Sequence, residues 1–103
     1  MKAITEHSIP ASHPSLPGHF PDHPVVPGVV LLEEIVMAIR AWQPTARILG
    51  FHTVKFLQPV TPDCRFSIAL ETFGNGKIGF SCSTGQRLLN SGTVILQVPQ
   101  GPA

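Results

Sequence analysis

The chain has 103 residues, a length that predicts one domain. Only 13% of its residues are charged and 43% are hydrophobic, so we expect a homo-oligomer that hides part of this apolar surface. The formal net charge of +1 argues against the concentrated basic surface that nucleic-acid binding requires.

The cellular environment can be inferred from what the sequence lacks. Cys64 and Cys82 are too few for a disulfide scaffold and have no metal-ligand spacing. The opening run MKAITEHSIP has no apolar core of the kind found in a secretory signal. The longest apolar stretch is interrupted by charged residues and is shorter than the ~20 residues that span a bilayer. We therefore expect a cytoplasmic protein that binds no membrane.

The first third of the chain predicts a strand, a shaped loop and a helix. A short strand is expected over residues 2–9. Six of the 11 prolines fall between positions 10 and 27, where fixed φ angles and missing N–H donors oppose regular structure. The apolar run 29–42 lies between Pro27-Gly28 and Pro44 and predicts one helix. Its apolar residues point in almost every direction, which indicates a helix surrounded by other structure.

Four extended segments follow, over residues 46–58, 64–73, 77–84 and 87–98. Apolar and polar residues alternate in the second and third segments, which is typical of half-buried strands. Gly74-Asn75-Gly76 predicts a hairpin turn between them, and Gly85 predicts the next turn. Gly92 suggests a bulge or bend in the last strand. The predicted fold is α+β, with a curved, mainly antiparallel sheet around one long central helix.

Two acidic residues interrupt the apolar helix. Glu33 and Glu34 lie about 100° apart around its axis, so we expect at least one carboxylate at a desolvated or interfacial position. A buried carboxylate favours its neutral form and can donate a proton near neutral pH. The alternative is that both side chains lie on an exposed edge of the helix.

The loop before the helix places two imidazoles close to these acids. His19 and His23 belong to the run HFPDHPVVPG, which leads directly into the helix. A base and an acid could converge here. The N–H of Gly28, at the helix N-terminus and with no side chain in the way, could bind a carbonyl oxygen as negative charge develops on it.

The run GHFPDHPVVPGVVLLEE resembles the signature of the β-hydroxyacyl-acyl-carrier-protein dehydratases, a hot-dog-fold family. In that family the catalytic acid follows the catalytic histidine by 14 positions, and the same spacing from His19 selects Glu33 and makes Glu34 a bystander. The segment VKFLQPVTPDC also resembles the family, so the similarity covers roughly residues 16–66. The short chain is most similar to the compact ApeI-like branch.

The resemblance implies a role for each matched residue. His19 would remove the proton next to the thioester, and Glu33 would help the β-hydroxyl leave as water. The N–H of Gly28 would polarise the thioester carbonyl, and the carbonyl of Val25 would orient His19. The two catalytic side chains would meet across a homodimer or a higher even oligomer. The implied substrate is a 3-hydroxyacyl chain on an acyl carrier protein, with no metal or other cofactor.

Two positions depart from the family pattern. Asp22 stands where glycine is usual, and Met37 stands where the larger dehydratases usually have glutamine. Candidates for the hydrophobic lining of an acyl tunnel are Phe51, Phe56, Leu57 and Phe80. The cations available to steer an acidic carrier protein are Arg40, Arg47, Lys55, Arg65, Lys77 and Arg87.

Three alternatives remain open. His13, His19, His23 and Asp22 together offer enough donors for a zinc site, although no cysteine pair supports one. The same fold could also carry a thioesterase. A third possibility is a non-catalytic protein that binds acyl thioesters or accompanies a true dehydratase.

Overall fold

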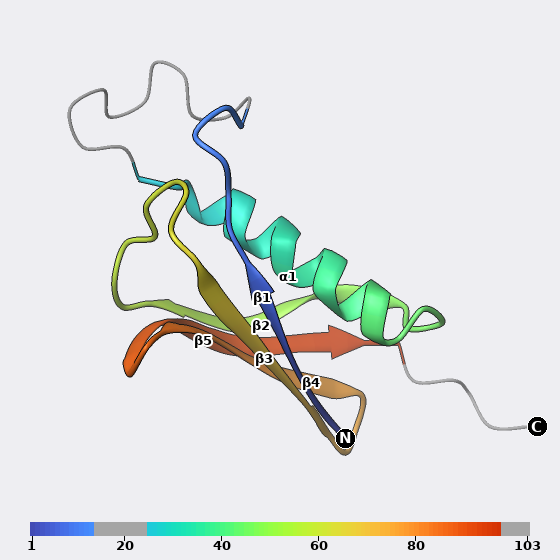
Figure 1. The fold of residues 1–103 in the computed structure, drawn as a ribbon. Helices are drawn as coiled ribbons and strands as arrows, with labels where there is room; N and C mark the ends of the chain where they lie inside the picture. Colours follow the sequence, from blue (N-terminus) through green and yellow to red (C-terminus); the bar gives the residue numbers. More distant parts are fainter. Residues whose placement is uncertain (14–24, 98–103) are drawn as a thin grey trace, which may run out of the picture.

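The computed structural model describes residues 1–13 and 25–97. One α-helix lies across one face of a five-stranded sheet (Figure 1). This architecture confirms the predicted α+β fold with a single long helix. The elements in chain order are β1 (Lys2–His7), α1 (Gly28–Trp42), β2 (Ile48–Phe56), β3 (Phe66–Phe73), β4 (Lys77–Thr84) and β5 (Arg87–Leu96).

The strands have the spatial order β1-β3-β4-β5-β2, and all four neighbouring pairs are antiparallel. The strands β1 and β2 are therefore the two edges. The turn between β3 and β4 contains Asn75 and Gly76 at φ 69° and 72°, and the next turn contains Gly85 at φ 58°. These left-handed conformations suit glycine and asparagine, so both predicted turns are confirmed.

The alternating pattern correctly identified the inward-facing residues of the two central strands. In β3 and β4 the buried side chains are Phe66, Ile68, Leu70, Ile78, Phe80 and Cys82. Cys64, the first residue of the predicted segment 64–73, is exposed because β3 begins two residues later.

Gly92 marks a close approach between β5 and β2. The register of this pair shifts between Phe51 and Thr53, so the irregularity lies on β2, beside the glycine's partner Val54. A Cβ atom at Gly92 would overlap with the carbonyl oxygen of Thr53 and would come within 2.6 Å of the Phe80 ring. Glycine is therefore required at position 92 because β5 has no room there for a side chain.

Helix α1 begins directly after Pro27, whose carbonyl accepts a hydrogen bond from the N–H of Val30 at 3.0 Å. One side of the helix packs on the sheet through Val30, Leu31, Ile35, Ala38 and Ile39.

The other side of α1 is exposed in the single protomer. Val29 and Met37 are 62% and 63% exposed, and Glu33 lies between them on the same stripe. The expectation of a helix covered on all sides is therefore not met within one chain. Among the described residues, no helix is long and apolar enough to cross a membrane.

Candidate active site

A groove of about 400 Å³ lies where the N-terminus of α1 approaches the end of β2. Among the described residues that line it, Gln58 has the one polar side chain. The lining residues are Val25, Val26, Gly28, Leu31, Phe56, Leu57, Gln58, Pro59 and Val60. An apolar groove with backbone polar groups at one end suits a ligand that is mostly hydrocarbon.

Backbone hydrogen bonds fix both walls of this groove. The N–H of Val26 donates to the carbonyl of Val60 at 2.8 Å, which ties the segment before α1 to the segment after β2. On the opposite wall, the N–H groups of Leu57 and Gln58 donate to the carbonyl of Leu89 at 2.9 and 3.0 Å. The groove is therefore held by α1, β2 and β5 together.

Gly28 and Phe56 meet at the helix end of the groove. A Cβ atom at Gly28 would lie 2.8 Å from Cζ of Phe56, so the ring occupies the space that a side chain would need. Phe56 itself is 54% exposed. Pro27 at the N-cap makes no side-chain capping hydrogen bond, and the first N–H groups of a helix have no partner within it. The partial positive charge at this helix end favours an oxygen that gains negative charge.

The structure brings together two of the four predicted site residues. Val25 and Gly28 both line the groove. Glu33 lies on the exposed side of α1 and is not part of the groove lining. His19 lies outside the described residues, so its pairing with Glu33 stays a prediction.

The candidates for the acyl tunnel divide into two pairs. Phe56 and Leu57 line the groove, as expected. Phe51 and Phe80 instead make an edge-to-face contact, with ring centroids 5.8 Å apart, and Phe80 belongs to the buried core. The two rings come together across β5, where Phe51 lies opposite Val94 and Phe80 lies opposite Gly92, two residues away.

Glu34 has a specific partner that the sequence did not reveal. Its Oε1 lies 2.8 Å from Nδ1 of His7 in β1, and the two side chains are 24% and 14% exposed. The other ring nitrogen, Nε2, lies 2.6 Å from the hydroxyl of Thr5, and the ring stacks on Phe66. His7 is therefore half-buried between β3 and the helix.

One signal for part of this cluster was present in the sequence. Residues two apart in a strand share a face, so Thr5 and His7 had to point the same way. Which part of α1 they meet depends on the pairing of β1 with β3, because that pairing brings the first strand beside a segment some 60 residues later.

Asn90 is a buried polar residue and is 1% exposed. Among residues 1–13 and 25–97, neither of its amide atoms has a well-formed hydrogen bond. It lies across the strands from Cys82 on β4 and from Phe56 on β2. Burial raises the pKa of the Cys82 thiol to about 12, and the neighbouring Asn90 amide offsets only part of this effect.

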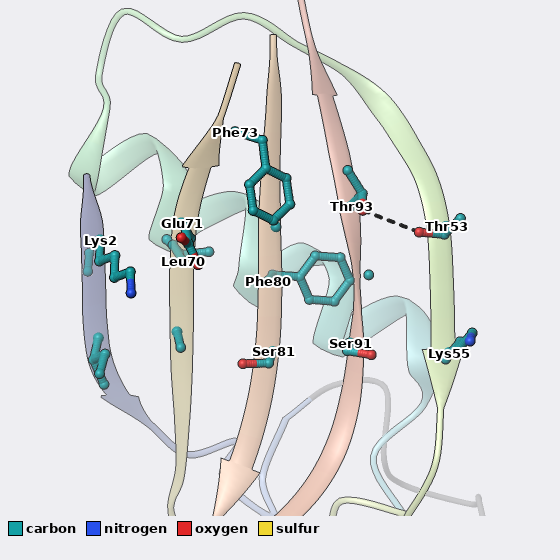
Figure 2. A pocket seen from close by; sticks show the side chains of 15 residues that line it. Lys2, Thr53, Lys55, Leu70, Glu71, Phe73, Phe80, Ser81, Ser91 and Thr93 are labelled. Atoms are coloured by element: carbon teal, nitrogen blue, oxygen red, sulfur yellow. Dashed lines mark hydrogen bonds between the residues drawn. The ribbon is translucent and has the colours of Figure 1, made fainter. Parts of the chain in front are cut away.

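A second hollow, of about 620 Å³, lies on the face of the sheet opposite α1 (Figure 2). Lys2 and Lys55 stand at its two edges, and the hydroxyls of Thr53 and Thr93 are 3.4 Å apart within it. Neither Val25, Gly28 nor Glu33 lines this hollow, although the tunnel candidate Phe80 and the cation Lys55 do. Because Val25 and Gly28 line the groove beside α1, that groove is the better candidate.

No group of three or more His, Cys, Asp or Glu side chains within residues 1–13 and 25–97 is arranged to hold a metal ion. His19, His23 and Asp22, three of the four residues considered for a zinc site, lie outside these ranges.

Sequence comparison identifies dehydratase relatives. A family model described as ApeI-like, ApeI dehydratase, matches residues 1–93. A 3-hydroxyacyl-[acyl-carrier-protein] dehydratase FabZ from Myxococcus xanthus is 32% identical over 74 residues, or 62% of this chain and 48% of the relative. A FabZ from Clostridium perfringens is 28% identical over 92 residues, or 81% and 66% of the two chains. The chain spans about half the length of the first curated relatives that it matches.

Solved structures share the fold. The dehydratase heterocomplex ApeI:P from Xenorhabdus doucetiae superposes with a TM-score of 0.82 at 19% identity, covering 94% of this chain and 88% of the other. A mutant of the fluoroacetyl-CoA-specific thioesterase FlK gives a TM-score of 0.65 at 14% identity, covering 91% and 82%. The fold is therefore the hot-dog fold, and because the family match covers nearly the whole chain, this protein belongs to the ApeI-like dehydratase family.

Proposed function

We propose that this protein dehydrates a 3-hydroxyacyl thioester, carried on an acyl carrier protein, to the trans-2-enoyl thioester. The observation that carries the proposal is the apolar groove at the N-terminus of α1, in which Val25 and Gly28 lie together. These residues come from the same motif that contains His19 and Glu33. The hydrocarbon chain would occupy the groove, with its thioester carbonyl near the N–H of Gly28.

The reaction needs one base and one acid. His19 removes a proton from the carbon next to the thioester, and the N–H of Gly28 stabilises the negative charge that develops on the carbonyl oxygen. Glu33 gives a proton to the β-hydroxyl, which leaves as water while the double bond forms between the α and β carbons. The carbonyl of Val25 orients the imidazole of His19.

We also propose that the active unit is a homodimer in which His19 of one protomer meets Glu33 of the other. In the single protomer Glu33 is exposed and does not line the groove, and it lies on a stripe flanked by Val29 and Met37. Strand β2 is an edge of the sheet, and Leu49 on it is 65% exposed. Together these apolar surfaces offer a contact area for a second chain.

The function can be tested with a 3-hydroxyacyl thioester, first on pantetheine and then on an acyl carrier protein. Enoyl product and free thiol are measured in the same reaction. Enoyl formation that is lost in His19→Ala and in Glu33→Gln, with Glu34→Gln as the matched control, supports the proposal. The proposal fails if the folded wild-type protein forms no enoyl product from any 3-hydroxyacyl thioester.

Two other functions have specific support. The thioesterase FlK shares the fold, and thiol release without enoyl product would favour that activity. The ApeI:P structure is described as a heterocomplex, so a non-catalytic partner of a second dehydratase chain is the other candidate. Binding of the acyl thioester without either product would favour it.

A further inference from the structure

The pair formed by His7 and Glu34 connects the helix to the first strand. Within residues 1–13 and 25–97, it is the one side-chain hydrogen bond described between α1 and the sheet. The atoms Nδ1 and Oε1 are 2.8 Å apart, and both side chains are largely shielded from water. Partial burial and a charged acceptor make such a hydrogen bond stronger than an exposed one.

The surroundings of His7 hold its ring in one orientation. In the neutral imidazole, Nδ1–H donates to Glu34 and Nε2 accepts from the hydroxyl of Thr5, which lies 2.6 Å away. The imidazolium form can donate at both nitrogens. Phe66 stacks on the ring with centroids 5.9 Å apart and an interplanar angle of 25°. The carboxylate of Glu34 is therefore held by a ring that is itself fixed by β1 and β3.

The position of Glu34 determines where its neighbour points. Successive residues in an α-helix are about 100° apart, so a helix whose Glu34 is held toward β1 presents Glu33 on the exposed stripe with Val29 and Met37. A rotation of the helix by about 10° would move a side-chain tip, at a radius of about 5–6 Å, by about 1 Å. A displacement of that size can lower the rate of a reaction by about 100-fold.

We propose that His7 and Glu34 are positioning residues that fix the rotation of α1 against β1 and thereby hold Glu33 in its reactive orientation. This inference rests on the proposed role of Glu33 as the acid. Neither His7 nor Glu34 needs to touch the substrate. The pair acts by holding α1 in one orientation relative to β1.

The test compares variants that break the pair with one that preserves it. His7→Ala and Glu34→Ala each remove the contact and should lower kcat by about 10- to 100-fold while KM changes less than about twofold. Glu34→Gln retains an oxygen acceptor for Nδ1–H and should keep kcat within about threefold of the wild-type value.

Glu6→Ala is the matched control. Glu6 is also on β1 and accepts a hydrogen bond from Ser67 at 2.6 Å, but its partner is on β3 and not on the helix. This variant should leave kcat unchanged. The inference is wrong if folded Glu34→Ala keeps wild-type kcat, or if Glu6→Ala lowers kcat as much as His7→Ala does.

Hydrogen exchange separates this inference from the proposed function. Amides in the first half of α1 should exchange at least several-fold faster in His7→Ala and Glu34→Ala than in Glu6→Ala. If the wild-type protein has no dehydratase activity, the proposed function fails, and the exchange rates still test the contact. Equal exchange in all three variants would overturn the positioning role whatever the activity.

Discussion

Replacing Gly28 by alanine should change the free energy of unfolding little but lower the dehydration rate strongly. The added methyl group would lie 2.8 Å from Cζ of Phe56 and 3.3 Å from the two adjacent ring carbons. These atoms are at the far end of a side chain that is 54% exposed, so the ring can turn toward solvent. The backbone of the groove wall does not need to move.

The expected change in the free energy of unfolding is therefore small. Gly28 is the first residue of α1, where alanine gains less over glycine than the about 1 kcal/mol of a helix interior, and this gain offsets part of the cost of displacing the ring. We expect Gly28→Ala to change the free energy of unfolding by no more than about 1 kcal/mol.

The effect on activity should be much larger. In the proposed mechanism the thioester carbonyl approaches the N–H of Gly28, and the added methyl group together with the displaced Phe56 ring would obstruct that approach. Loss of one hydrogen-bond donor to a developing oxyanion commonly lowers kcat by about 100- to 1000-fold. We expect kcat/KM for dehydration to fall by at least about 100-fold.

Two measurements are made on the same samples. The rate of enoyl formation reports activity, and urea titration gives the free energy of unfolding. Gly50→Ala is the control, because a Cβ atom at Gly50 would have no neighbour within 4 Å. A Gly28→Ala protein with wild-type rate and stability would refute the assignment of the thioester to this end of the groove. If Phe56→Ala restored the rate of Gly28→Ala, the displaced ring and not the blocked N–H would be the cause.

Other expectations concern the acids, the buried amide and the thiols. Glu33→Gln should reduce the initial rate below about 1% while Glu34→Gln keeps most of it, and an inactive Glu34→Gln would show that the wrong acid was assigned. Asn90→Leu should raise the free energy of unfolding by about 1–2 kcal/mol in urea titrations, because it removes two unsatisfied buried atoms; a loss of stability would indicate a hidden partner. Iodoacetamide should label exposed Cys64 and spare Cys82 in the folded protein. Burial raises the pKa of the Cys82 thiol from 9.0 to about 12, so the thiol loses its proton at lower pH in the unfolded chain than in the folded one. The free energy of unfolding should therefore decline as pH rises from about 9 to 12.

Local patterns were sufficient for most of the fold. The alternation in β3 and β4 identified Ile68, Ile78 and Phe80 as inward-facing, because a strand has a fixed period of two. The turn at Asn75 was equally predictable, since few residues accept its positive φ. Each of these features depends on neighbours close in sequence.

The site was less predictable because its contacts join distant segments. Val25 and Gly28 come from one motif, and the structure places both in the groove. The contact of His7 with Glu34 joins residues 27 apart and depends on where β1 lies beside β3. Phe51 and Phe80 were assigned to the tunnel on hydrophobicity alone, which cannot distinguish a core ring from one that lines a groove.

The exposed stripe of α1 links the proposed chemistry to assembly. A carboxyl group becomes an effective proton donor near neutral pH when its surroundings exclude water. In the single protomer Glu33 is exposed, and its apolar neighbours Val29 and Met37 are 62% and 63% exposed. A second chain that packs on this stripe would bury the two apolar side chains and remove water from the carboxylate in one step. The proposed dimer would then supply both the missing imidazole and the environment that the acid needs, so activity should depend on protein concentration wherever the dimer dissociates.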